Sequence, residues 1–298
     1  MSSDAPTTGA TALTAGATAD ASGPPVAGPG SPVAEVLFTE DLSVGHGSRV
    51  VCAGIDLEIA PGRLTVVVGP NGCGKSTLLR TMARLQPPLG GTVRLGDDDL
   101  GRLRPRDVAR RVAFLPQSPL VPEGVTVRQL VGYGRHPHQG ILGTVRDDDR
   151  DAVAWALGAT GLDPLADRLV DTLSGGERQR AWIAMTLAQR TGVLLLDEPT
   201  TFLDVRHQLD LMHLLRRLVS EHGLAVALVL HDLNQAAGFA DHMLLLAGGG
   251  VVARGRPTEV LTADHVRTAF EVDARVVVDD ATGIPTCVFP GRDAALAP

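Results

Sequence analysis

The chain has 298 residues, and its 27 basic and 34 acidic side chains give a formal net charge of −7 at pH 7. This acidic balance argues against a nucleic-acid-binding protein, because binding to a phosphate backbone normally relies on an excess of lysine and arginine. Hydrophobic residues make up 44% of the chain, which is enough for a sizeable core and excludes disorder over most of the length.

No part of the sequence approaches the roughly 18 to 20 consecutive apolar residues that a membrane-spanning helix needs. The longest uninterrupted apolar run covers residues 224–230, so we expect any role at a membrane to be peripheral. The three cysteines, Cys52, Cys73 and Cys287, are an odd number in a chain too long to depend on disulfides. We therefore expect a reducing cytosol.

Residues 1–34 consist almost entirely of alanine, threonine, glycine, serine and proline. Because such a composition cannot bury enough apolar surface to fold, we predict a disordered leader over residues 1–34. A secretory signal is the alternative, but the segment has neither a basic start nor an apolar stretch. The first basic residue of the chain is Arg49.

The folded region is expected to begin at residue 35 with short antiparallel strands. Ile55, Leu57 and Ile59 alternate with the polar residues Asp56 and Glu58. This alternation is typical of strands with one buried face.

Continuous apolar runs follow, and they are typical of strands buried on both faces. Helical spacing separates them, as in Leu78, Leu79 and Met82, so the order of elements predicts an α/β fold with a mostly parallel sheet. The runs cover residues 64–68, 193–196, 226–230 and 243–246.

Residues 117–190 are poor in such runs and carry helical patterns around 153–157 and 182–187. We predict a helical insert of about 117–190 in the sheet domain. The pattern around 262–270 predicts a further helix within a C-terminal extension of about 256–298. Residues 35–298 should therefore form one domain with subdomains.

Residues 69–77 read GPNGCGKST, a full match to G-x-x-x-x-G-K-[ST] between the first buried strand and a helical run. The backbone N–H groups of such a loop face one anion, and the helix start adds partial positive charge. We expect Lys75 to reach the β- and γ-phosphates of a nucleoside triphosphate and Ser76 to bind Mg²⁺. A glycine-rich turn without a ligand is the alternative. The predicted nucleotide-binding residues are Gly69, Pro70, Asn71, Gly72, Cys73, Gly74, Lys75, Ser76 and Thr77.

Two acids, Asp197 and Glu198, follow the apolar run at 193–196. They stand at the carboxyl end of a strand, where ligands of parallel sheets gather. We expect Asp197 to contact Mg²⁺ through water and Glu198 to act as general base or to position the attacking water. An isolated pair of this kind could equally be two solvated acids, and the phosphate loop favours the catalytic interpretation.

Residues 173–179 read LSGGERQ and precede a helical pattern. Ser174 and Glu177 have the spacing of a capping box. A serine and two glycines, Gly175 and Gly176, at a helix N-terminus also form a second anion-binding surface. A chain with two surfaces for a triphosphate favours a dimer.

Taken together, these motifs resemble those of the nucleotide-binding subunit of an ATP-binding cassette (ABC) transporter, over about residues 35–298. GPNGCGKST resembles the Walker A motif, LLLDEP the Walker B motif and LSGGERQ the signature. Gln117 in FLPQ resembles the Q-loop, Leu203-Asp204 the D-loop and His231 in LHDL the switch histidine. The resemblance implies a P-loop NTPase (RecA-like) fold: a mostly parallel sheet core, an N-terminal antiparallel β subdomain and an inserted helical subdomain.

The resemblance also implies a head-to-tail homodimer with two ATP molecules at its interface. Each ATP would lie between one subunit's phosphate loop and the other's Ser174, Gly175, Gly176 and Glu177. Asp204 would contact the opposite subunit, although an N-cap aspartate would look the same. The implied catalytic residues are Glu198, His231 and Gln117, and the implied Mg²⁺ ligands are Ser76, Gln117 and Asp197.

His46 in VGHG departs from the family pattern, which has an aromatic residue here, usually tyrosine, stacked on adenine. An imidazole stacks with less area, so a plain loop histidine is the alternative. The preference for adenine over guanine is therefore implied by the family and not by the site residues.

Residues 131–140, VGYGRHPHQG, are similar to a stretch of the ATPases that serve ferric-siderophore, haem and cobalamin importers. The resemblance implies permease contacts at Tyr133, Arg135 and His136, with a glycine-rich surface loop as the alternative. Metal binding by His136 and His138 would lack a third ligand. The tail around 281–285 resembles the same subfamily.

The predicted protein is an ATPase at the cytoplasmic face of the cell membrane that energises an importer. Its expected partners are a membrane permease and an extracytoplasmic solute-binding protein, and ferric siderophores are the favoured cargo over haem, cobalamin or another chelate. An exporter ATPase is one rival. A DNA-repair or ribosome-acting ABC ATPase is another, but residues 75–174 show no sustained heptads. A P-loop kinase would not carry the LSGGE signature.

Overall fold

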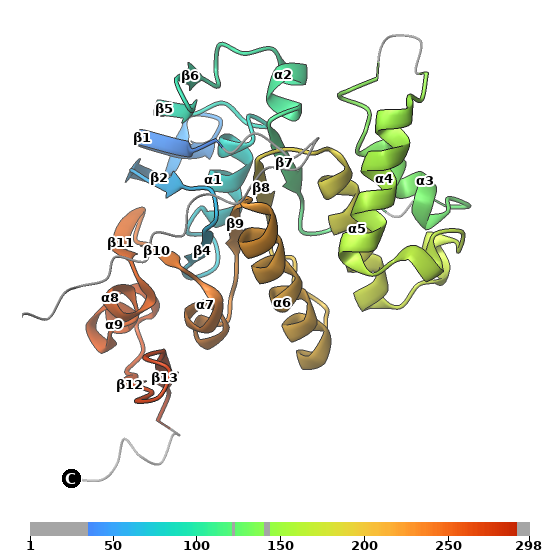
Figure 1. Ribbon diagram of the computed structural model, residues 1–298. Coiled ribbons are helices and arrows are strands. Elements are labelled where there is room, and N and C mark those ends of the chain that lie inside the picture. Colours follow the sequence, from blue (N-terminus) through green and yellow to red (C-terminus); the bar gives the residue numbers. More distant parts are fainter. Residues whose placement is uncertain (1–34, 121–122, 140–143, 291–298) are drawn as a thin grey trace, which may run out of the picture.

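The computed structural model describes residues 35–120, 123–139 and 144–290, so the predicted leader at 1–34 lies outside it. A six-stranded sheet forms the centre of the molecule, in the order β11-β10-β4-β9-β8-β7 (Figure 1). The strands from β10 to β7 are parallel, and β11 is an antiparallel edge strand. They comprise β4 (Leu64–Val68), β7 (Val112–Leu115), β8 (Val193–Leu196), β9 (Ala225–Val229), β10 (His242–Ala247) and β11 (Gly250–Gly255).

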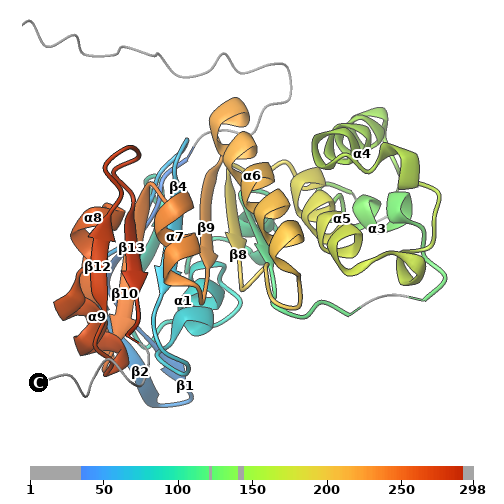
Figure 2. The same cartoon turned by 90° about the horizontal axis from the view of Figure 1, so that it is seen from below.

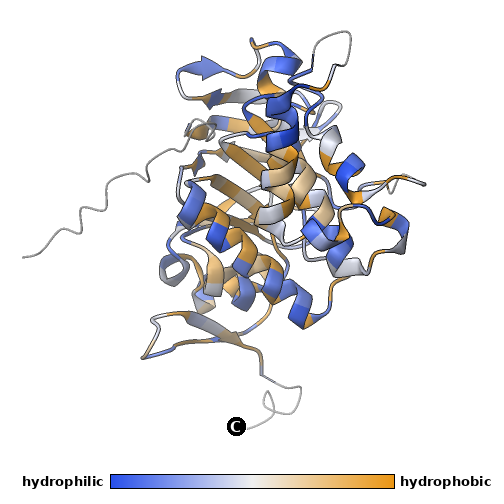
Figure 3. Ribbon diagram, turned by 45° about the vertical axis from the view of Figure 1, so that its right-hand side comes forward, coloured by the Kyte–Doolittle hydropathy of each residue, from blue (hydrophilic) through white to orange (hydrophobic). Residues whose placement is uncertain are grey.

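Both faces of this sheet are buried, which explains the continuous apolar runs. Leu64, Val66 and Val68 of β4 pack into one hydrophobic core, whereas Val67 packs into a second core on the opposite face, as the two-residue period of a strand requires. Figure 3 shows these strands as hydrophobic ribbons between the surrounding helices. The predicted strands at 64–68 and 193–196 are confirmed, and the other two differ by one residue at their ends.

An antiparallel sheet formed mostly by the N-terminal strands packs over the second core, in the order β2-β1-β5-β6 with β3 paired to β1. Leu78 and Met82 of helix α1 (Lys75–Met82) fill the space between the two sheets together with Leu37 and Ile55. The predicted antiparallel subdomain is confirmed. Its strands are β1 (Leu37–His46), β2 (Arg49–Ile55), β3 (Glu58–Ile59), β5 (Gly90–Leu95) and β6 (Asp98–Asp99).

Helices α3 (Val127–Tyr133), α4 (Asp147–Thr160) and α5 (Gly175–Ala188) lie between β7 and β8 in the chain, inside the predicted insert. Figures 1 and 2 both show them gathered on one side of the central sheet. The short helix α2 (Pro105–Ala109) precedes β7. Helix α3 was not predicted, because its seven residues are too few for a clear helical period.

The C-terminal third contains α6 (Val205–His222), α7 (Leu233–Phe239), α8 (Pro257–Val260) and α9 (Ala263–Phe270). The predicted helix around 262–270 is confirmed. An unpredicted hairpin of β12 (Arg275–Val278) and β13 (Pro285–Val288) packs against α7 (Figure 2), where Asn234 exchanges hydrogen bonds with the backbone of Cys287 at 3.2 and 2.7 Å. Within the described ranges, no helix combines the length and apolar character needed to cross a membrane.

Candidate functional site

The predicted phosphate loop joins the end of β4 to the start of α1. Gly69 has a φ of 149°, and a Cβ there would lie 2.1 Å from the carbonyl oxygen of Leu246. Gly74 has a φ of 106°, another conformation that side chains rarely adopt. The Lys75 ammonium donates hydrogen bonds to the carbonyl oxygens of Gly69 at 2.8 Å and Pro70 at 2.9 Å. The loop therefore has a fixed shape with its only full cation at its centre.

The loop opens on a cavity of about 570 Å³, within the usual size range for a bound cofactor. Arg49 and Glu198 contribute charged groups of opposite sign to its walls, and Val50 and Val51 contribute apolar surface. From the loop itself, the lining residues are Asn71, Gly72, Gly74, Lys75, Ser76 and Thr77.

His46 lies at the end of β1, where the β1–β2 hairpin brings it opposite Arg49. Its side chain lines the same cavity, and its Nε2 is 3.3 Å from the Thr77 hydroxyl. The hairpin therefore places His46 beside the phosphate loop. Stacking on adenine stays a prediction.

Ser76 and Asp197 are joined directly: the Ser76 hydroxyl donates to Asp197 Oδ1 at 2.7 Å. Asp197 is only 1% exposed, and this burial raises the pKa of its carboxyl, partly offset by the Ser76 hydrogen bond and by Arg80. Its Oδ2 lies 3.6 Å from the Arg80 guanidinium and has no hydrogen-bond partner among the described residues. Sequence reasoning missed Arg80, although its spacing of four residues from Ser76 places both on one face of α1.

A buried carboxylate oxygen without a partner, next to a serine hydroxyl, suits a hard divalent cation. In the part of the chain that the structure describes, no group of three or more histidine, cysteine, aspartate or glutamate side chains could hold a metal by itself. A cation here would therefore complete its shell with phosphate oxygens and water. The donor set fits Mg²⁺, which keeps water ligands and binds through one or two protein groups and a nucleotide.

Glu198 lies at the centre of a second cluster. Its Oε2 accepts hydrogen bonds from Gln117 Nε2 at 2.5 Å and from the Thr201 hydroxyl at 3.2 Å, and its Oε1 is 2.7 Å from His231 Nε2. Glu198 itself has a φ of 51°, a strained conformation of the kind that concentrates at functional sites. The three predicted catalytic residues thus meet, because they follow the carboxyl ends of the neighbouring strands β7, β8 and β9. Gln117 was also a predicted Mg²⁺ ligand, together with Ser76 and Asp197. In the structure its side chain bonds to Glu198 and not to the Ser76–Asp197 pair.

Ser174 caps helix α5. Its hydroxyl accepts from the Glu177 amide at 3.3 Å and donates to Glu177 Oε2 at 2.8 Å. The Ser174 amide also donates to Glu177 Oε2, at 2.9 Å. The hydrogen bonds from the Ser174 amide and hydroxyl lower the pKa of the Glu177 carboxyl. Figures 1 and 2 show α5 apart from α1 in both views. Within one chain, the signature and the phosphate loop therefore do not share a site.

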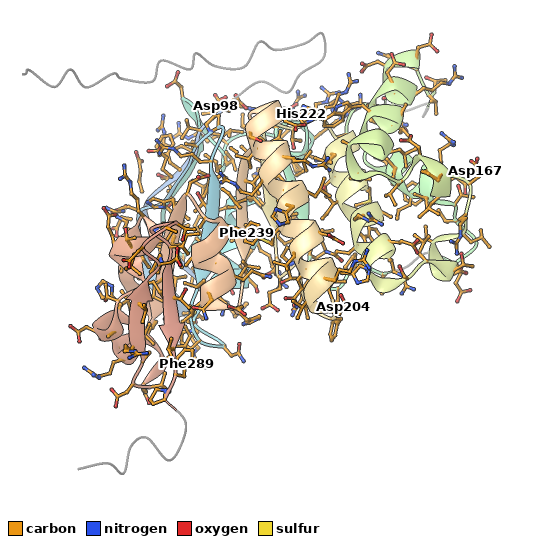
Figure 4. The ribbon with its side chains drawn as sticks, turned by 60° about the horizontal axis from the view of Figure 1, so that its bottom comes forward. Asp98, Asp167, Asp204, His222, Phe239 and Phe289 are labelled. Carbon is orange, nitrogen blue, oxygen red and sulfur yellow. The ribbon has the colours of Figure 1, made fainter. Side chains whose placement is uncertain are left out.

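Asp204 is the N-cap of α6, with its Oδ1 accepting from the amide of His207 at 2.9 Å and lying 2.8 Å from the ring Nδ1. Figure 4 shows α6 running from Asp204 at one end to His222 at the other. The His207 ring also packs on Gly176, where an added Cβ would lie 2.3 Å from its Cδ2. His207, missed in the sequence, therefore joins the predicted D-loop to the signature. A contact of Asp204 with a second chain stays a prediction.

The predicted permease contact at Arg135 is wrong. Arg135 is 2% exposed, and its guanidinium donates to Asp149 at 2.8 Å, to the Ala188 carbonyl at 2.9 Å and to Asp148 at 3.0 Å. An arginine that holds α4 and α5 together presents no charge to a partner. Tyr133 and His136 are exposed and stacked, with ring centroids 5.6 Å apart, and their role stays a prediction.

Comparison with known proteins identifies the family. The model described as ABC transporter matches residues 52–201. The chain belongs to the ABC transporter family. This ABC subunit is 46% identical to the iron(3+)-hydroxamate import ATP-binding protein of Bacillus subtilis (strain 168), over 85% of this chain and 94% of that protein. It is 47% identical to the ferric enterobactin transport ATP-binding protein of Escherichia coli (strain K12), over 86% and 94%.

Solved structures agree with the fold of this ABC subunit. A chain of an ABC transporter in an inward-facing conformation aligns with a TM-score of 0.76 and 25% identity, over 87% of this chain and 99% of that one. An ATP-binding cassette in its ADP conformation aligns with a TM-score of 0.71 and 22% identity, over 80% and 97%. The predicted P-loop NTPase fold is confirmed, and the chain is an ATP-binding ATPase subunit of the ABC type.

Proposed function

We propose that this ATPase energises an importer of ferric siderophores. The observation that carries the catalytic part is the position of Glu198, which contacts both Gln117 and His231 beside the phosphate-loop cavity. The choice of import and cargo is supported by relatives that are 46–48% identical over 85–86% of the chain and are named for hydroxamate, siderophore, achromobactin or enterobactin transport.

In the proposed mechanism, the backbone of the phosphate loop and Lys75 bind the phosphates of ATP. Ser76 and Asp197 hold Mg²⁺, which neutralises charge on the phosphates when bound. Glu198 orients the attacking water and accepts its proton, because it is the acid that faces the cavity and is held at both oxygens. His231 and Gln117 keep that carboxylate in place.

The proposed active assembly is a homodimer in which Ser174 and Gly175 of one subunit complete the ATP site of the other. Two features support it: Ser174 and Gly175 are exposed at the start of α5, and α5 lies apart from the phosphate loop of its own chain. The shared γ-phosphate would link the two acidic chains, and its hydrolysis would release them.

The assembly also includes a membrane permease, which is supported by the relatives named as import or transport ATP-binding proteins. We place the subunit at the cytoplasmic face of the cell membrane. A solute-binding protein outside the membrane would deliver the chelate. Haem or cobalamin is the second cargo candidate, because a cobalamin import ATP-binding protein of Halobacterium salinarum is 44% identical over 84% of this chain.

The direct test is uptake of radiolabelled iron, as ferric hydroxamate and as ferric enterobactin, by a strain that lacks this gene. Labelled haem and cobalamin are measured in parallel. We expect the deletion to abolish uptake of a ferric siderophore, wild-type protein to restore it, and Lys75→Ala to fail. If the deletion abolishes uptake of haem or cobalamin alone, that compound replaces the ferric siderophore as the proposed cargo. Unchanged uptake of all four compounds would contradict import of iron chelates.

A further inference from the structure

A second cavity, of about 610 Å³, lies at the opposite end of the central sheet from the phosphate loop. Arg63, which directly precedes β4, and His242, the first residue of β10, both line it. The phosphate loop follows the other end of β4, and five strand residues separate the two by roughly 16 Å. The cavity is as large as the nucleotide cavity and shares no lining residue with it.

Further walls of this cavity come from α6 and from three segments that are distant in the sequence: the end of α7, the start of α8 and the tip of the β12–β13 hairpin. Figure 4 labels Phe239 at the end of α7, beside α6, where its ring meets His213 at 5.2 Å. Pro257 of α8 and Pro285 of the hairpin lie on the other walls. A ligand here would touch all three segments at once.

The charged groups on the walls are mostly basic: Arg63, Arg216 and Arg256 against one acid, Asp241. Asp241 Oδ2 is already used, since it accepts from Arg216 at 2.6 Å and from the Leu64 amide at 2.8 Å. Among the described residues, neither Arg63 nor Arg256 forms an ion pair, although Glu259 accepts from the Arg256 backbone amide at 2.8 Å. The positive charges of Arg63 and Arg256 are therefore not balanced by an acidic partner among the described residues, although the net charge of the chain is −7.

His242 supplies an independent observation. Its ring Nδ1 is covered and has no hydrogen-bond partner in the described part of the chain, and such groups in native structures usually indicate a missing ligand or water. Burial lowers the pKa of His242, and Arg63 and Arg254 lower it further against the opposite effect of Glu58 and Glu259. These effects favour the neutral form of the ring, and an anion bound beside it would favour the protonated form.

We propose that this cavity binds a small multivalent oxyanion, a polycarboxylate or a polyphosphate, between Arg63 and Arg256 with His242 at its side. Guanidinium groups bind carboxylate and phosphate oxygens in pairs, and the volume admits a molecule larger than a single phosphate. Arg216 supports the site by pairing with Asp241 at 2.6 Å, which compensates the only acidic charge on the cavity walls. The site is independent of the proposed function, because no residue of the ATPase machinery lines it.

Isothermal titration with citrate and, separately, with pyrophosphate tests the site. The full-length Lys75→Ala protein is used, so that pyrophosphate cannot bind at the phosphate loop. We expect one of the two anions to bind with a Kd below the millimolar range. Arg63→Gln and Arg256→Gln, each added to that background, should weaken binding at least tenfold with an unchanged unfolding temperature.

Arg217→Gln is the matched control, because Arg217 is an exposed neighbour of Arg216 on α6 that does not line the cavity. It removes the same charge and should leave the affinity unchanged. Binding of citrate alone identifies a polycarboxylate site, and binding of pyrophosphate alone identifies a phosphate site. In either case, the anion should raise the pKa of His242 in an NMR titration. The proposal is refuted if neither anion binds at millimolar concentration, or if binding survives the Arg63→Gln/Arg256→Gln double substitution.

Discussion

Arg135→Ala should destabilise the whole domain. The substitution removes three charge-assisted hydrogen bonds and leaves Asp149, whose side chain is 6% exposed, without its counter-ion. Removing one partner of a buried ion pair costs about 3–5 kcal/mol of unfolding free energy. For a chain of this size, each kcal/mol lowers the unfolding temperature by roughly 2–4 °C, so we expect a fall of about 6–20 °C.

The matched control is Arg128→Ala in the preceding helix α3, since the Arg128–Asp167 pair is largely exposed, with side chains 52% and 85% accessible. Such a pair contributes at most about 1 kcal/mol. Unfolding of both variants is followed by circular dichroism under identical conditions. If the unfolding temperature of Arg135→Ala falls no further than that of the control, the structural role of Arg135 is refuted. The permease contact at Arg135 would then stand again as a prediction.

The same pair predicts a pH dependence. Burial raises the pKa of Asp149, but hydrogen bonds from the Arg146 amide and from Arg135 outweigh it, so the pKa of this carboxyl lies below its usual range. Its stabilising contribution is therefore present above the unfolded-state pKa of about 3.9 and is lost as pH falls through the lower folded-state value. Arg135→Ala should therefore narrow the difference between the unfolding free energies measured at pH 7 and at about pH 2.

Other predictions concern the ATP site. Lys75 is the only lysine of the chain, so ATP should protect it from an amine-selective reagent, and Lys75→Ala should abolish nucleotide binding; unchanged affinity would contradict the phosphate-loop assignment. Gly176→Ala should displace the His207 ring and lower kcat with ATP binding to the monomer preserved, and adding His207→Ala should relieve the clash without restoring full activity; normal turnover of Gly176→Ala would contradict the contact. Burial raises the pKa of the Cys73 thiol, so alkylation should be slow at pH 7, faster above pH 9 and blocked by ATP. Rapid ATP-insensitive alkylation at pH 7 would oppose this placement.

Local sequence signals predicted much of the fold because burial on both faces produces continuous apolar strands. The run at 64–68 and the glycines around Lys75 fix a strand, a turn and a helix without long-range information. The β12–β13 hairpin depends instead on a distant partner, Asn234, which bonds the Cys287 backbone across 53 residues. Such pairing leaves no local periodicity to find.

The meeting of Gln117, Glu198 and His231 was predictable, because each of them follows a strand of one parallel sheet. The burial of Arg135 was not predictable, because nothing in the Gly-rich segment around this basic residue indicates that its side chain is buried. Its environment is set by Asp149 and the end of α5, which only the folded chain brings together. His207 was missed for the same reason: its contact with Gly176 joins two helix N-termini that are 31 residues apart.

The most direct test of the account is the Glu198→Gln variant. It keeps the shape of the side chain but removes the carboxylate that contacts His231 and Gln117. Purified variant and wild type are incubated with Mg²⁺ and ATP, phosphate release is measured, and the assembly state is followed by light scattering. We predict normal ATP binding, turnover reduced by about 10²–10⁴-fold and accumulation of a stable dimer. Turnover equal to that of the wild type, with no dimer, would contradict the central role of Glu198.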